Sequence, residues 1–149
     1  MDKQYSNLVK NRNEQIHFNS MFNDSSLEAV YDSGTTGHYI TPTTQCTNKQ
    51  TATQPIPIKM TNGEIITSSH IALLPQHNLP YKAPQAHIFQ GLQKPFISIG
   101  TLCDNNFIAV FDEKRITIYD KLTRQIVMQG HRDPNTTLYM INMAAPLGK

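Results

Sequence analysis

The residues best suited to chemistry stand together at positions 32–37 of this 149-residue chain. Asp32 follows an apolar, β-prone run and precedes the small residues Ser33, Gly34 and Thr35. A carboxylate held rigidly in such a turn can act as a general acid or base. Gly34 allows the backbone to approach a substrate closely, and the two hydroxyls can bond to neighbouring main chain. Asp-Ser-Gly alone is weakly specific, because most turns of this composition have no chemical role.

A single aspartate is a poor general base at neutral pH, because its unperturbed pKa is about 3.9. Two carboxylates within hydrogen-bonding distance share one proton, so that one can activate water while the other protonates a carbonyl oxygen. A second Asp-Ser/Thr-Gly is absent from the sequence. The second carboxylate must therefore come from another copy of the chain, and a two-fold dimer would place both Asp32 side chains on its axis. Such a pair predicts the highest activity at mildly acidic pH.

Other catalytic chemistries are not indicated. The six histidines have no His or Cys partner at zinc-ligand spacing, and neither a Gly-x-Ser-x-Gly elbow nor a phosphate-binding loop occurs. We therefore expect no metal and no cofactor. His38 could line a site, although a histidine that bonds to nearby main chain is the simpler interpretation. Cys103 follows Leu102, which favours a buried core thiol.

Composition bounds the remaining function classes. The formal net charge is only +2 and no dense Lys/Arg cluster occurs, so direct nucleic-acid binding is not indicated. The sequence contains no apolar run long enough to span a membrane, and its first residues lack the apolar region of a secretory signal. Two widely separated cysteines, Cys46 and Cys103, favour free thiols in a reducing cytosol. We expect a soluble, cytoplasmic protein.

The elements that must position Asp32 read as short strands separated by turns. Residues 1–26 are polar and predict a linker or a short helix, and residues 45–54 predict an exposed loop. From residue 27 onward, about ten short apolar runs with turns every eight to twelve residues are typical of a small all-β barrel or sandwich. The first two runs, 27–31 and 38–40, flank the Asp32 turn.

The clearest local pattern is a β-hairpin over residues 56–66. Alternating apolar residues lead into Asn62-Gly63, which favours a two-residue type I′ turn with Met60 opposite Ile65. Pro57 cannot donate to a strand ladder, so the first arm must be an edge. A hairpin with a free edge and a glycine tip could act as a movable flap. An ordinary surface hairpin fits the same pattern.

Taken in order, three segments resemble retrotransposon proteases. Val30–His38 looks like the Asp-Ser-Gly-Ala-Ser/Thr-x-His stretch of these enzymes, with Thr35 and Thr36 in place of the commoner Ala and Ser. Ile58–Glu64 resembles their flap. Ile97–Asp104 is similar to the Leu-Leu-Ser-Val-Gly-Gln-Leu-Cys-Asp block of copia-type Pol polyproteins. The resemblance extends over residues 28–142.

The resemblance implies a retropepsin-like aspartic protease over residues 27–130, with a C-terminal strand and the start of the pre-integrase segment over 131–149. The family fold is a small closed β-barrel with a hairpin flap. It acts as a homodimer that cleaves a Gag-Pol polyprotein, within virus-like particles in the cytoplasm. A catalytically inactive β-barrel that serves as a structural or assembly module of a Pol polyprotein is the alternative.

The resemblance also assigns roles to residues. Asp32 would be the catalytic aspartate, and Ser33 would bond across the dimer. The other implied site residues complete the active loop, form the flap that closes over the peptide and support the loop from behind: Gly34 and Thr35; Met60, Thr61, Asn62, Gly63 and Glu64; and Ile97, Ile99 and Gly100.

Overall fold

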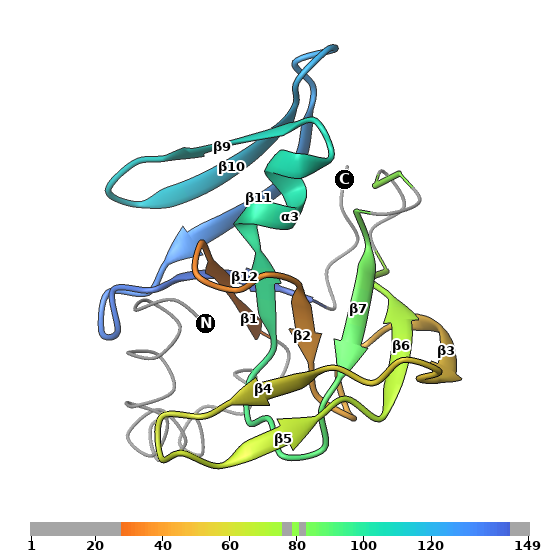
Figure 1. Ribbon diagram of the computed structural model, residues 1–149. Helices are drawn as coiled ribbons and strands as arrows, with labels where there is room; N and C mark the ends of the chain where they lie inside the picture. Colours follow the sequence, from red (N-terminus) through yellow and green to blue (C-terminus); the bar gives the residue numbers. More distant parts are fainter. Residues whose placement is uncertain (1–27, 76–78, 81–82, 144–149) are drawn as a thin grey trace.

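Twelve strands and one short helix make up the part of the chain that this computed structural model describes, residues 28–75, 79–80 and 83–143. This composition confirms the all-β class (Figure 1). The expected linker over residues 1–26 lies outside the described residues. The strands are Glu28–Asp32 (β1), His38–Ile40 (β2), Thr47–Thr51 (β3), Pro57–Lys59 (β4), Ile65–Thr67 (β5), His70–Leu73 (β6), Gln85–Ile88 (β7), Phe96–Ser98 (β8), Phe107–Phe111 (β9), Arg115–Asp120 (β10), Ile126–Arg132 (β11) and Tyr139–Asn142 (β12), and the helix is Ile99–Asp104 (α3).

Ten of the strands form one sheet in the order β3-β6-β7-β2-β8-β1-β12-β11-β10-β9, and β4 and β5 form a separate pair. The expected closure into a barrel is not found in the described residues, because β3 and β9 stand at opposite ends of the sheet. The two-stranded hairpin and the β9–β10 end lie at opposite ends of the molecule (Figure 1). The sheet is therefore open.

The centre of the sheet positions the Asp32 turn. Strand β8 lies between β1 and β2: it runs parallel to β1, with Asp32 opposite Ser98, and antiparallel to β2, with Tyr39 opposite Phe96. The chain therefore leaves β1, turns over the end of β8 and returns as β2. The middle of strand β1 is apolar and both of its faces are buried there, with Tyr31 in one core cluster and Val30 in another.

One element prediction needs correction. Residues 45–54 do not form a loop throughout, because Thr47–Thr51 is a strand that pairs with β6. Its five residues are all exposed, so it carries no apolar alternation by which a strand is recognised in a sequence. The apolar residues 96–100 are divided between two elements, because β8 ends at Ser98 and helix α3 begins at Ile99.

Helix α3 is the one helix among the described residues. It is not long and apolar enough to cross a membrane. It starts after Ser98 because the Ser98 side chain accepts a hydrogen bond from the backbone N–H of Thr101, which caps the first turn. Ile99 and Leu102 form its buried face. Cys103 lies on the other face and is exposed, so the expectation of a core thiol is wrong.

The predicted hairpin exists, but its register differs by one residue. Lys59, not Met60, stands opposite Ile65. The backbone N–H of Gly63 donates to the Met60 carbonyl at 2.9 Å, and the N–H of Met60 donates to the Glu64 carbonyl at 2.7 Å. Gly63 has φ of +88°, whereas Asn62 is not in the left-handed region. A type I′ turn needs both residues there, so the chain makes a three-residue loop instead.

The C-terminal strands continue the sheet beyond β1. Strand β12 pairs with β1 on one side and with β11 on the other. The expected domain boundary at residue 130 falls within β11 and stays a prediction. Gly130 on β11 is so closely surrounded that an added Cβ would collide with the carbonyl oxygen of Met140 and lie 2.7 Å from Cε2 of Tyr31. Any larger residue at position 130 would clash with these atoms, so the packing requires a glycine there.

Candidate active-site loop

Asp32 is the last residue of β1 and is completely buried, with 0% of its surface exposed. Its Oδ1 atom accepts a hydrogen bond of 2.7 Å from the backbone N–H of Gly34. This bond closes an aspartate turn. The expectation that the Thr35 hydroxyl bonds to neighbouring main chain is wrong, because its Oγ1 atom is buried without a hydrogen-bond partner among the described residues. Gly34 and Thr35 are also buried, whereas the Ser33 residue is exposed. The turn therefore holds the carboxylate by its own main chain.

Long-range hydrogen bonds hold the rest of the turn. The Ser98 hydroxyl donates to the Thr35 carbonyl at 2.8 Å, and the Thr101 hydroxyl donates to the Thr36 carbonyl at 3.4 Å. Both donors lie at the start of α3, beside the turn in Figure 1. On the other side, Oγ1 of Thr36 and the hydroxyl of Tyr39 lie 2.9 Å apart. The turn is thus fixed to elements on both of its flanks.

His38 is fully buried at the start of β2 and bonds to main chain through both ring nitrogens. Nδ1 accepts the N–H of Ser98 at 2.9 Å, and Nε2 lies 2.6 Å from the Ala83 carbonyl. Because a carbonyl can only accept, the proton must be on Nε2 and the ring is neutral. Burial lowers the pKa of His38 to about 4, although the bond to Ala83 raises it somewhat. The simpler interpretation of this histidine therefore holds.

The expected supporting residues divide into two groups. Ile97 is fully buried opposite Tyr31, and Ile99 is 7% exposed on the inner face of α3, so both pack behind the turn. Gly100 is exposed, and an added Cβ there would meet only the Ser98 hydroxyl, at 3.8 Å. Space at this position does not require a glycine.

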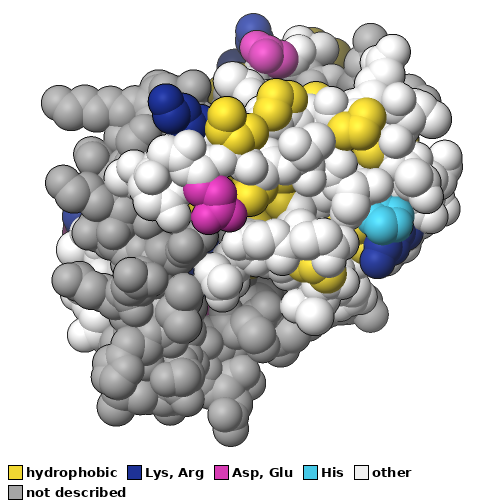
Figure 2. Space-filling view, turned by 60° about the horizontal axis from the view of Figure 1, so that its bottom comes forward, with side chains coloured by type: hydrophobic (Ala, Val, Ile, Leu, Met, Phe, Trp, Pro, Cys, Tyr) yellow, Lys and Arg dark blue, Asp and Glu magenta, His cyan; other side chains and the backbone are white. Residues whose placement is uncertain are grey.

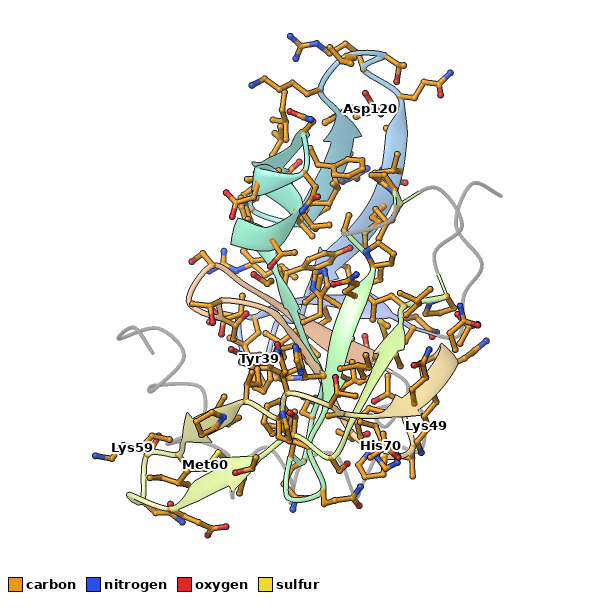
Figure 3. All side chains as sticks on the ribbon, turned by 45° about the vertical axis from the view of Figure 1, so that its right-hand side comes forward. Tyr39, Lys49, Lys59, Met60, His70 and Asp120 are labelled. Carbon is orange, nitrogen blue, oxygen red and sulfur yellow. The ribbon has the colours of Figure 1, made fainter. Side chains whose placement is uncertain are left out.

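The hairpin has a buried root and an exposed tip. Ile58 and Met60 are 5% and 3% exposed and belong to an apolar cluster that also contains Tyr39 and Phe89. Thr61, Asn62, Gly63 and Glu64 are all exposed. In Figure 3, Lys59 points away from the domain, and Tyr39 lies between Met60 and the end of the molecule that carries α3. Tyr39 is thus shared by the hairpin root and, through Thr36, by the Asp32 turn.

The face that carries the hairpin is weakly charged. Figure 2 shows this face with white atoms predominating, yellow apolar side chains scattered among them and few charged groups in the described part. Ile65 of β5 is 63% exposed.

Elsewhere, a surface hollow lies over β3, β6 and β7. Its lining includes Gln50, Ile71 and His87, and it contains none of the site residues expected from the sequence. The described residues bring no three His, Cys, Asp or Glu side chains together at a possible metal site. Cys46 and Cys103 are both free thiols.

Comparison with known proteins returned no match: no family model, no curated protein and no solved structure is similar to this chain. The sequence analysis did not identify Ser98 and Thr101 as the residues whose hydroxyls bond to the Asp32 turn. A serine that ends an apolar strand and precedes a short Ile-Gly-Thr-Leu segment is a helix-start signal that could have revealed the first of them.

Proposed function

We propose that this chain is an aspartic endopeptidase domain of the copia retrotransposon type, with a retroviral-protease-like fold. The observation that carries the proposal is the Asp32 turn: a carboxylate at the end of a buried strand, held by Gly34 and braced through Thr35 and Thr36 from the start of α3. Strand β8 lies between the two strands of the turn, in the place that a supporting block behind the active loop requires.

The chemistry requires two such turns. In the proposed dimer, one Asp32 carboxylate takes a proton from a water molecule while the protonated Asp32 of the second copy donates to the oxygen of the scissile carbonyl. The water oxygen bonds to the carbonyl carbon, and a tetrahedral diol forms. The first carboxyl then gives its proton to the amide nitrogen, and the second carboxylate takes a proton from a diol hydroxyl as the C–N bond breaks. The products are a carboxylic acid and an amine, and the pair regains its starting protonation. Ser33 is exposed and thus accessible to the second copy.

The hairpin supplies the flap in this proposal. Its root is anchored by Ile58 and Met60, and its tip at Gly63 is exposed. An extended polypeptide, such as a segment of a Gag-Pol polyprotein, would lie between the tip and the Asp32 turns. No nucleic acid, metal or cofactor takes part, and the compartment is the cytoplasm or a virus-like particle.

Replacement of Asp32 by Asn tests the proposal, because the amide oxygen can still accept the Gly34 N–H while the group cannot ionise. The full chain is incubated with a proteome-derived peptide library, and the products are identified by mass spectrometry. We expect cleavage by wild type, a rate that rises faster than linearly with enzyme concentration, and no cleavage by Asp32→Asn. Asp104→Asn, an exposed aspartate on α3, is the matched control and should cleave normally.

A non-catalytic module is the second candidate, and the complete burial of Asp32 favours it. In that case the carboxylate only stabilises its own turn. A chain that stays monomeric at high concentration in sedimentation equilibrium, and that cleaves no peptide of the library, would establish this reading and reject the protease.

A further inference from the structure

We infer that His38 is a positioning residue for the Asp32 carboxylate, an inference that rests on the proposed protease function. Its ring fixes the backbone at Ser98, and the Ser98 hydroxyl in turn fixes the turn that holds Asp32. His38 does not act on the substrate in this inference. Instead, His38 fixes the position of Asp32, the residue that acts on the substrate.

The first step is the His38–Ser98 contact. The ring spans two segments far apart in the chain, with the Ser98 N–H on Nδ1 and the Ala83 carbonyl at Nε2. Both bonds are buried, and each uses the only hydrogen-bonding capacity that the neutral ring offers at that nitrogen. The ring therefore fixes the position of the β8 backbone at Ser98 relative to β2.

The second step is the contact between Ser98 and the turn. Ser98 is completely buried and stands opposite Asp32 in the β1–β8 register. Its single hydroxyl proton goes to the Thr35 carbonyl, at 2.8 Å, and its lone pair accepts the Thr101 N–H, at 3.0 Å. The Ser98 side chain thus links the turn to the start of α3, and the position of Ser98 is itself fixed by its bond to His38.

The third step reaches the carboxylate. Thr35 directly follows Gly34, whose N–H holds Oδ1 of Asp32 at 2.7 Å. A shift of the Thr35 carbonyl therefore moves the donor that orients Asp32. Catalytic groups must be held to within about 0.5 Å, so loss of this chain of contacts should lower kcat. KM should change little, because neither His38 nor Ser98 contacts the peptide in this arrangement.

Two substitutions of His38 separate its two contacts. The Asn side-chain oxygen lies where Nδ1 lies and can still accept the Ser98 N–H. The Gln side-chain nitrogen lies near Nε2 and can only replace the bond to Ala83. Cleavage of the best library peptide by the full chain gives kcat and KM, urea unfolding gives stability, and NMR hydrogen exchange of the Gly34 amide reports on the turn itself.

We expect His38→Asn to keep kcat within about threefold, and His38→Gln to lower kcat by about tenfold or more with KM unchanged, as loss of an orienting hydrogen bond implies. Gly34 exchange should accelerate only in His38→Gln. Equal kcat losses in both variants, or losses that follow stability alone, would overturn the inference.

Two further variants keep the test decisive if His38→Gln does not fold. Ser98→Ala removes the hydroxyl bond and should accelerate Gly34 exchange, while Ser98→Thr retains a hydroxyl and should not. Unchanged exchange in Ser98→Ala would refute the positioning role. If wild type cleaves nothing, the protease proposal fails, and the Gly34 exchange data still decide whether His38 and Ser98 hold the turn.

Discussion

Two loops in this molecule contain a glycine beside small polar residues, and they are held in opposite ways. The 33–37 turn is fixed by side chains from distant parts of the sequence: Ser98, 63 residues from Thr35, and Thr101, 65 residues from Thr36. The hairpin tip at 61–64 is held by bonds between near neighbours, such as the Glu64 N–H to the Asn62 side chain, two residues away. The first loop therefore combines local bonds with contacts that cross the fold, whereas the bond between Asn62 and Glu64 stays within the hairpin.

This difference is the one expected if the chain is a protease, in which the two loops would need different mobility. A catalytic carboxylate must not move, whereas a flap must open and close. Loops held by local bonds open at low free-energy cost, and loops tied into the core open only when the core does. The boundary between the two regimes lies at the hairpin root, where Met60 is buried and Thr61 is exposed.

The root should be the costliest part of the hairpin to alter. Met60→Ala removes a side chain that packs with Tyr39 and Phe89 and is expected to lower the free energy of unfolding by about 2 to 5 kcal/mol. Urea unfolding measures this loss, and Met60→Leu, of similar volume, should cost under about 1.5 kcal/mol. A loss as small as that of the leucine variant would mean that the root is as loosely held as the tip.

Acidification should loosen the Asp32 turn and leave the hairpin tip unaffected. Burial lowers the pKa of His38 to about 4, below the value of about 6.5 in an unfolded chain, so the unfolded state binds the proton more readily. The stabilisation is therefore complete above pH 6.5 and declines as the pH falls towards 4, by about 3 kcal/mol in total. Protonated Nδ1 can no longer accept the Ser98 N–H.

Unfolding free energies of wild type and His38→Asn from pH 8 to 4 test this expectation, because the variant lacks the titrating ring while other groups titrate alike in both. The wild-type curve should fall more steeply between pH 6.5 and 4. Parallel curves would contradict it. In a protease, this loss would set the acid limit of activity, whereas pairing of the Asp32 carboxylates would set the opposite limit.

Removal of the Ser98 hydroxyl should have a smaller but more widely distributed effect. Ser98→Ala deletes the helix cap and the bond to Thr35 together, at an expected cost of about 1 to 2 kcal/mol. Native-state hydrogen exchange should show the loss at both α3 and the turn. A loss confined to α3 would indicate that the turn does not depend on Ser98.

The contrast between the loops also explains how far the sequence could lead. Short apolar strands such as β1 and β2 are encoded locally, and the predicted runs 27–31 and 38–40 lie within a residue of the observed bounds. Strand β3 is polar and exposed along its length, so its sequence has no apolar pattern that predicts a strand. The partners of the Asp32 turn are long-range, so the sequence identified Asp32 and its glycine but not Ser98, whose role depends on the β1–β8 register.

The smallest effect is expected at the hairpin tip. Gly63 has φ of +88°, and an added Cβ would meet no atom within 4 Å, so Gly63→Ala should cost only the backbone strain, about 1 kcal/mol. Gly63→Asn should cost less, because asparagine tolerates this conformation. Thermal unfolding gives both values, and hydrogen exchange at the Asp32 turn should stay at the wild-type rate. An accelerated Gly34 amide in Gly63→Ala would show that tip and turn are coupled, and the distinction between a locally held flap and a core-held carboxylate would then fail.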